Sequence, residues 1–450
     1  MKKPFAITLD VGSSLENRTG SWRTLRPAYV HKLPPCNNQC PAGEDIQGWL
    51  FYSESGNYEK AWRHLTKRNP LPACMGRVCY HTCEGACNRG CLDESVGINS
   101  VERFLGDHAI ENGYAFVKPK KLSGKKVLVV GSGPASLSAA YQLALKGHDV
   151  TIKEGSPQAG GMMRYGIPKY RLPRHVLDKE IQRILDLGVK LELNTTVMDV
   201  NDEMKNNGYD AVFLGVGANL AKRAYIPGGD AKHMLDAVSV LRSMEGEGEP
   251  LLGRKVVVYG GGNTAIDVAR SAKRLGAEPL IIYRRTRDKM PAHDFEVEEA
   301  LQEGVSVKWL STISEVDSGQ EIKIEKMKLD ENGHPQPTGE FETVKADAVV
   351  LALGQNVDLG LLKSVEGLKI ENGSVIVDSN MFTGVKGIYA GGDMVPGERN
   401  VTVAIGHGYK AARAIDAFLN GKEVVVPPKH QIVTFDQLNT WYYSDAPKTV

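Results

Sequence analysis

The chain has 450 residues, of which 42% are hydrophobic, and its formal net charge is +1. A chain of this length can bury two or three cores, so we expect several domains. The balanced charge gives no reason to expect nucleic acid or an anionic membrane surface as a partner. No apolar run follows the two N-terminal lysines, and none approaches the length of a membrane span, so we expect a soluble, cytoplasmic protein.

Residues 1–34 are mixed polar and apolar, and Pro27 and Pro34 exclude a long helix there. We expect an extended arm that packs on the body of the protein or on a partner, with a disordered terminus as the alternative.

A compact unit that contains every cysteine follows this arm. The seven cysteines are Cys36, Cys40, Cys74, Cys79, Cys83, Cys87 and Cys91. An odd number cannot be fully paired as disulfides within one chain, and disulfides are rare in the cytoplasm, so the clustering indicates metal. Apolar residues at helical spacing in 45–52 and 58–65 predict a helical hairpin between the first two cysteines and the rest. One tetrahedral zinc needs only four ligands, so the number favours iron–sulfur over zinc, which stays the alternative.

Residues 125–154 have the plan of a dinucleotide-binding unit. The apolar run 127–130 suits a buried parallel strand, 136–145 has the spacing of a helix, and 149–153 is the next strand. Glu154, at the end of that strand, is placed to bind a ribose hydroxyl.

The turn between that strand and helix carries two glycines. Gly131 allows the tight turn, and Gly133 lets the backbone approach a pyrophosphate at the positive N-terminus of the helix, which begins with Pro134 and Ala135. We therefore predict that this unit binds FAD.

Two later glycine-rich segments are predicted to serve the same site. The loop 160–168 contains Gly161 and Met162 and could cover an isoalloxazine ring, although it could equally be a structural connector. In 387–393 a strand ends at Gly392 and Asp393, where the acid could accept a hydrogen bond from a ribitol hydroxyl or could cap a helix.

A second unit of the same plan begins at Val256. Its glycine-rich turn carries four of the predicted nucleotide contacts, which are Gly260, Gly262, Asn263 and Thr264. Its second strand ends in Arg284 and Arg285, where an acid would suit NAD and arginine favours the 2′-phosphate of NADP. Exposed arginines can also be plain surface charge, so the preference for NADP is modest.

The predicted fold class is α/β, with two Rossmann-like nucleotide-binding domains preceded by an α-helical iron–sulfur domain. The expected organisation is an N-terminal arm at 1–34, a helical [4Fe-4S] domain at 35–118, an FAD domain at 119–250 and 343–424 with an NAD(P) domain at 251–342 inserted into it, and a C-terminal tail at 425–450.

Together these motifs resemble the small (beta) subunit of glutamate synthase and its relatives. The matching stretches are 76–79, 83–87, the Gly131 turn, YGIPKYRLP at 165–173, GGGNTAID at 260–267, YRR at 283–285 and AGGD at 390–393. The resemblance implies two [4Fe-4S] clusters beside FAD, with NAD(P) on the far side of the flavin.

The resemblance also implies ligand sets. One set comprises Cys40, Cys79, Cys83 and Glu102, and Cys36 and Cys87 are half of the other. Relatives carry two further cysteines where residues 26–33 have none, so we predict that Cys74 and Cys91 complete the second cluster. The alternative is one cluster together with a cysteine-rich remnant. Arg171 and Met162 are implied to line the FAD site, and Gly354 to border the nicotinamide nucleotide.

The function implied by the resemblance is hydride exchange between NAD(P)(H) and FAD, followed by single-electron transfer through the clusters to or from a partner oxidoreductase. The arm resembles flavin subunits of 2-oxoacid:acceptor oxidoreductases of the phenylglyoxylate dehydrogenase type, and the alternative is the glutamate synthase small subunit. We expect partners to be the catalytic and ferredoxin-like subunits of a larger complex. No acid–base triad is expected, and His175, His233, His293 and His407 are interpreted as structural or exposed.

Two rival interpretations remain. A thioredoxin reductase-like enzyme needs a redox cysteine pair near the flavin, but residues 92–450 contain no cysteine. A zinc-bearing interaction module without turnover is the second, and iron analysis with a visible spectrum distinguishes it from a flavin and iron–sulfur protein.

Overall fold

The computed structural model describes residues 32–222, 226–227, 233–245, 252–317, 320–426 and 430–440. All but the last three residues of the arm predicted for 1–34 lie outside these ranges. Within them, no helix is both long and apolar enough to cross a membrane.

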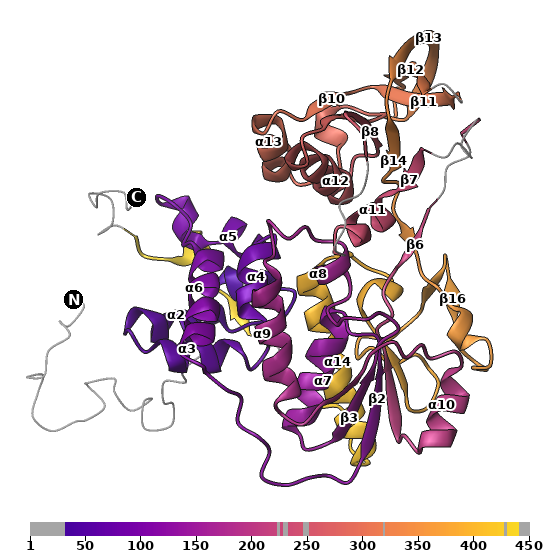
Figure 1. The fold of residues 1–450 in the computed structure, drawn as a ribbon. Coiled ribbons are helices and arrows are strands. Elements are labelled where there is room, and N and C mark those ends of the chain that lie inside the picture. Colours follow the sequence, from indigo (N-terminus) through magenta and orange to yellow (C-terminus); the bar gives the residue numbers. More distant parts are fainter. Residues whose placement is uncertain are drawn as a thin grey trace, which may run out of the picture.

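A helical unit occupies residues 35–111, at the indigo end of the chain (Figure 1). Its elements are α1 (Pro35–Gln39), α2 (Ile46–Glu54), α3 (Tyr58–Leu65), α4 (Pro72–Val78), α5 (Thr82–Gly85), η2 (Asn88–Cys91) and α6 (Ile98–Glu111). The predicted hairpin is confirmed as α2 and α3. The side chains of Asp45 and Asn57 begin these helices by accepting hydrogen bonds from the backbone N–H groups of Gly48 and Lys60.

The first sheet is parallel and has the strand order β18-β5-β2-β3-β4. Its strands are β2 (Lys126–Val130), β3 (Asp149–Lys153), β4 (Lys190–Glu192), β5 (Ala211–Leu214) and β18 (Ile388–Ala390). The run Val127–Val130 at the centre of the sheet is buried, as expected for a parallel strand covered on both faces. Because β18 pairs with β5, the chain returns to this sheet near its C-terminal end, as predicted.

Two long helices pack on one another beside this sheet (Figure 1). They are α7 (Pro134–Leu145) and α14 (Val401–Leu419), and they meet at Gly408, where an added Cβ would lie 2.2 Å from the carbonyl oxygen of Ala135. The hydroxyl of Ser138 donates to the carbonyl of Ile405 at 2.8 Å across the same contact. The other helices of this domain are α8 (Met162–Tyr165), α9 (Arg174–Leu185) and α10 (Val200–Asn207), with α9 contacting α4 and α6 of the helical unit.

A second parallel sheet has the order β10-β9-β8-β14-β7. Its strands are β7 (Met234–Asp236), β8 (Lys255–Tyr259), β9 (Glu278–Ile282), β10 (Ser306–Lys308) and β14 (Ala348–Leu351), and its helices are α11 (Ala237–Ser243), α12 (Asn263–Arg274) and α13 (Asp294–Gln302). The predicted range 251–342 is therefore too short, because β7 and β14 flank it on both sides. A buried parallel strand has the same apolar pattern in either sheet, so the sequence did not show to which sheet β14 belongs.

A three-stranded antiparallel sheet extends this second domain and was not predicted. It consists of β11 (Ser311–Val316), β12 (Glu321–Leu329) and β13 (Pro335–Lys345). The two chain segments that connect the domains pair with each other as β6 (Leu220–Ala221) and β15 (Gln355–Asn356), which run antiparallel. The remaining short elements of the first domain are η4 (Gly360–Leu362), β16 (Ile370–Glu371), β17 (Ser374–Val375) and η5 (Gly392–Met394).

The described part of the predicted tail returns to the helical unit. Strand β19 (Gln431–Ile432) pairs in parallel with β1 (Lys32–Leu33), and η6 (Phe435–Gln437) contacts η2. The amide of Asn88 donates to the carbonyl of Val433 at 2.9 Å. The surface that this tail covers therefore adjoins the cysteine-rich segment.

Candidate functional site

The two glycine-rich turns have the same local geometry. The added Cβ of Gly131 would lie 2.6 Å from the carbonyl oxygen of Gly215, and that of Gly260 would lie 2.3 Å from the carbonyl oxygen of Ala352, so neither position tolerates a side chain. Gly133 and Gly262 are the N-caps of α7 and α12, and open space surrounds the place where their Cβ would be. Neither helix has a side-chain cap, which leaves backbone N–H groups available for an anion.

A cavity of about 720 Å³ lies above the first turn, within the size range of cofactor pockets. Twelve of the predicted cofactor residues line it, and these are Gly131, Gly133, Pro134, Ala135, Glu154, Gly161, Met162, Arg171, Asn263, Thr264, Gly392 and Asp393. Residues of the first sheet's domain, the second domain and the helical unit therefore meet at one cavity.

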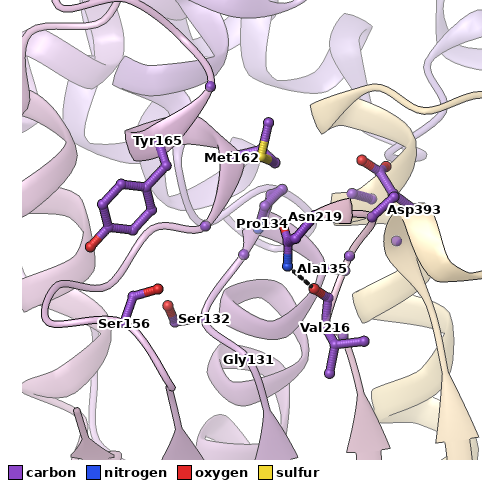
Figure 2. Close-up of a pocket in the computed structure, with 18 of the residues that line it drawn as sticks. Gly131, Ser132, Pro134, Ala135, Ser156, Met162, Tyr165, Val216, Asn219 and Asp393 are labelled. Atoms are coloured by element: carbon purple, nitrogen blue, oxygen red, sulfur yellow. Dashed lines mark hydrogen bonds between the residues drawn. The ribbon is translucent and has the colours of Figure 1, made fainter. Parts of the chain in front are cut away.

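The carboxylate of Glu154 lines the cavity and is held by Ser132 and Ser156, which lie side by side in Figure 2. One of its oxygens accepts hydrogen bonds from the backbone N–H and the hydroxyl of Ser132 at 2.9 and 2.6 Å, and the other accepts from the N–H of Ser156 at 2.7 Å. A carboxylate has about four acceptor positions, so Glu154 retains capacity for a ribose hydroxyl.

The floor of the cavity is made of closely approaching glycines. An added Cβ on Gly161, at φ +54°, would lie 2.7 Å from Cα of Gly133, and one on Gly392, at φ +72°, would lie 3.2 Å from the Cβ of Ala135. Asp393 lies on the opposite side of Figure 2 from Ser156, and burial raises the pKa of its carboxyl group. A cavity of this volume, lined by the glycine-rich turn and by the close approach of Gly161 to Gly133, fits a dinucleotide such as FAD.

Arg171 joins the two nucleotide domains. Its guanidinium contacts the two carboxylate oxygens of Asp267 at 2.8 and 2.9 Å, and it pairs with Glu296 at 2.5 Å. These carboxylates belong to α12 and α13, and all three side chains are largely buried. Arg171 thus lines the cavity as expected, but its charge is balanced by the second domain.

The helical unit also reaches the second nucleotide turn. The side chain of Asn263 donates to the hydroxyl of Tyr80 at 2.5 Å and accepts from the backbone N–H of His293 at 3.1 Å. The rings of Tyr80 and His293 are stacked, with centroids 3.7 Å apart. Tyr80 immediately follows Cys79, so the cysteine-rich segment and the start of α12 are in direct contact.

The remaining predicted nucleotide residues lie away from the cavity lining. Arg284 is exposed after β9 and Arg285 is half-buried beside it. Gly354 has a positive φ of +95° just before β15, where its neighbour Gln355 lines the cavity. Their roles stay predictions.

The first predicted ligand set is gathered in one place. The partly buried thiols of Cys40 and Cys79 and the buried thiol of Cys83 interact electrostatically with the carboxyl group of Glu102. Burial, with Glu102 beside it, raises the pKa of Cys79 to about 12. Its sulfur accepts hydrogen bonds from the hydroxyl of Thr402 at 3.2 Å and from the N–H of His81 at 3.3 Å.

These contacts fit a thiolate ligand, since hydrogen bonds to sulfur are the usual support of iron–sulfur ligands. As the side chains are placed, no three His, Cys, Asp or Glu residues in the described ranges form a ready metal-holding group. The three thiols and the Glu102 carboxylate therefore lie in the same region, but they are not arranged around a common centre.

Glu102 is fixed by the helical unit. The amide of Asn69 donates to Glu102 at 2.7 Å and to the carboxylate of Glu44 at 3.0 Å. The indole N–H of Trp49 donates to the other oxygen of Glu44 at 3.2 Å. Burial raises the pKa of Glu102 well above its usual range and that of Glu44 to about 7.

The second predicted set is brought together only in part. Cys36 and Cys87 lie close enough for their charges to interact. Cys91 is exposed at the end of η2 and stays a predicted ligand only. The structure does not favour Cys74 as a ligand, because its fully buried thiol interacts with the carboxylate of Glu180 on α9. That carboxylate also accepts from the N–H groups of Ala73 and Cys74 and lies 3.8 Å from the guanidinium of Arg183.

The histidines occupy structural positions. His407 accepts the backbone N–H of Gly392 at 3.2 Å, and burial lowers its pKa to about 4. His175 is exposed. Tyr80 and Arg242 are among the cavity residues that the sequence reasoning missed. The position of Tyr80 next to Cys79 was an available signal, whereas nothing in the sequence around Arg242 indicated a cofactor.

Comparison with known proteins agrees with this arrangement. Residues 125–408 match the family described as pyridine nucleotide-disulphide oxidoreductase, and residues 26–114 match the one described as dihydropyrimidine dehydrogenase domain II, 4Fe-4S cluster. Among solved structures, Mycobacterium tuberculosis FprA in complex with NADPH has a TM-score of 0.57 at 18% identity, covering 66% of this chain and 85% of that one, which shows the fold alone.

Two curated relatives illustrate the sequence likeness. The chain is 38% identical over 449 residues to the NADP(+)-dependent formate dehydrogenase subunit beta of Moorella thermoacetica, with 90% of this chain and 62% of that one covered. It is 33% identical over 425 residues to the glutamate synthase [NADPH] small chain of Escherichia coli (strain K12), with 87% and 89% covered. The chain thus spans less than two thirds of the first relative.

The matched families define an oxidoreductase domain that binds FAD and NAD(P)(H), preceded in the chain by a [4Fe-4S] domain. The chain belongs to the pyridine nucleotide-disulphide oxidoreductase family, in the group that includes the glutamate synthase small chain. The predicted resemblance and fold class are confirmed.

Proposed function

We propose that this chain exchanges hydride between NAD(P)(H) and FAD and passes electrons singly through [4Fe-4S] clusters to or from a partner subunit. The observation that supports this proposal is the position of Cys79 next to the cofactor cavity. Its two neighbours, Val78 and Tyr80, both line the cofactor cavity, and its sulfur is bonded to Thr402 of α14. A cluster held there would be separated from the flavin by little more than these side chains.

The chain's own residues supply binding and positioning. The uncapped start of α7 and the open space at Gly133 receive a pyrophosphate, Glu154 receives a ribose hydroxyl, and Asp393 faces the other end. The bound flavin supplies the change from two-electron to one-electron chemistry. No side chain is required to act as a general acid or base.

Iron is proposed to be held first by Cys40, Cys79, Cys83 and Glu102. The proposed second cluster would use Cys36 and Cys87, with Cys91 as the further candidate. Cys74 is left out, because its thiol is committed to Glu180 in the core.

NADP is proposed over NAD. Arg284 lies exposed at the end of β9, at the strand end where the 2′-phosphate is bound in this fold. The printed names of both curated relatives also specify NADP(H).

The proposed partner is another subunit of a multisubunit oxidoreductase, as the beta and small-chain names of the relatives indicate for those proteins. A 2-oxoacid:acceptor oxidoreductase stays the predicted partner class. Delivery of NADPH electrons to a glutamate-forming large subunit is the second candidate, which the 89% coverage of the glutamate synthase small chain favours.

The test uses Cys40→Ala with Cys74→Ala as the matched control, since both cysteines lie in the helical unit but only Cys40 belongs to the proposed first set. The Cys40 variant should keep FAD and NADPH-dependent reduction of an artificial flavin acceptor, while its iron content and electron transfer to a one-electron protein acceptor fall. The Cys74 variant should keep its iron. Equal loss of both activities in an FAD-loaded Cys40 variant, or equal iron loss in both variants, contradicts the proposal.

A further inference from the structure

Helix α11 belongs to the second sheet's domain but contributes to the flavin cavity. It follows β7, the edge strand of that sheet, and contacts α8 of the first domain (Figure 1). Two of its residues, Val238 and Arg242, line the cavity. The second domain therefore closes this side of the cavity, although the glycine-rich turn at Gly131 belongs to the first domain.

Arg242 makes two contacts at the end of the cavity marked by Glu154. Its guanidinium donates to the hydroxyl of Ser156 at 2.7 Å and lies over the ring of Tyr165, 4.5 Å from the centroid. Ser156 in turn donates its backbone N–H to Glu154, the residue assigned to a ribose hydroxyl. Figure 2 shows Ser156 and Tyr165 together at this end, away from Asp393.

A buried ion pair fixes α11 in this position. Glu245, just after the helix, contacts the guanidinium of Arg174 on α9 at 2.5 Å, and both side chains are mostly buried. Arg174 also donates to the carbonyl groups of Arg164, Ile167 and Leu172, which belong to the loop that carries Tyr165. Through Arg174 and Glu245, helix α11 and the segment that carries Tyr165 are thus held next to each other.

We propose that Arg242 closes the adenosine end of the FAD site and selects for the adenosine half of the cofactor. A guanidinium has two faces and five N–H donors. One face lies over Tyr165, and the opposite face can stack on a purine while the remaining donors reach ribose or phosphate oxygens. The affinity for FAD then depends on the second domain, although the glycine-rich turn at Gly131 lies in the first domain. This inference rests on the flavin site proposed above, but not on the clusters or on electron transfer.

The test measures cofactor affinity in the full chain rather than activity. In Arg242→Ala, the dissociation constants of FAD and of ADP, which is the adenosine half alone, should both rise by about tenfold, the usual weight of a charged hydrogen bond or a stacked cation. The affinity for FMN, which lacks the adenosine, should stay the same. Arg242→Lys keeps the charge without the planar group. On a logarithmic scale, it should therefore restore less than half of the FAD and ADP affinity that Arg242→Ala loses.

Arg254→Ala is the matched control, because Arg254 lies exposed in the same domain and pairs with Glu278 away from the cavity. It should leave all three affinities unchanged. Unchanged ADP affinity in the Arg242→Ala variant overturns the proposal. So does an equal loss of FMN and ADP affinity, since Arg242 would then act through the fold; circular dichroism of each variant confirms that it is folded.

Discussion

In the contact between Arg171, Asp267 and Glu296, the buried carboxyl group of Glu296 makes the stability of the fold depend on pH. Burial raises the pKa of Glu296 to about 7, above its ordinary value of 4.5, in spite of the attraction of Arg171 and with added repulsion from Asp267. The folded chain therefore holds this proton more tightly than the unfolded chain. Its contribution favours folding at low pH and is lost as the pH rises from 4.5 through 7.

Glu296→Gln should remove this dependence. As the pH is raised from 5 to 8, the unfolding temperature of the wild type should fall relative to that of the variant. The fall should correspond to a loss of about 3 kcal/mol in the free energy of unfolding. The difference should level off above pH 8. Thermal unfolding of both FAD-loaded chains across this range measures it, and a difference that stays constant with pH contradicts the assignment.

At the residue scale, the sequence located the glycines and acids of the cavity but not every contact. Gly131, Gly133 and Glu154 were predictable because their roles are set by the local strand–turn–helix pattern. Arg242 was not, because its place at the cavity depends on the packing of one domain on another. The environment of Cys74 was not predictable either, because cysteine spacing does not distinguish a ligand from a buried thiol.

At the element scale, the contact between α7 and α14 positions both sides of the flavin cavity. α7 carries Pro134 and Ala135 at its start, and α14 carries Ala404, which also lines the cavity. The helices approach closely only because residue 408 has no side chain, since a Cβ there would lie 2.2 Å from one backbone atom of α7 and 2.8 Å from another.

Gly408→Ala should force these helices apart. The expected cost is about 1–3 kcal/mol of stability, as for other overpacked cores, together with weaker FAD binding because Ala135 must move. Thermal unfolding and an FAD titration measure the two effects. Gly97→Ala is the control, because its Cβ would meet nothing closer than 3.8 Å and its φ of −70° suits alanine. If both variants behave alike, this helix contact does not shape the site.

Most elements of the first domain were predictable, whereas the limits of the second were not. Helix α7, for example, was expected at 136–145 and spans Pro134–Leu145, since its residues have regular helical spacing. Strands β7 and β14 complete the second sheet from distant parts of the chain, and β11 to β13 have mostly exposed residues without a nucleotide motif. Pairing between distant segments is not visible in local periodicity.

At the scale of the whole molecule, three units converge on one cavity. The first sheet supplies the turn for the pyrophosphate, the second domain supplies Asn263 and Arg242, and the helical unit supplies Tyr80 beside Cys79. The three units that an electron route from nicotinamide nucleotide through flavin to iron requires therefore meet at this cavity.

The most direct test of this route is metal and cofactor analysis of the anaerobically purified chain, followed by reduction with NADPH. We predict bound FAD together with iron and acid-labile sulfide, and reduction of both the flavin and the iron–sulfur absorption by NADPH. A yellow protein that is free of iron, with zinc bound to its cysteines, would contradict the account.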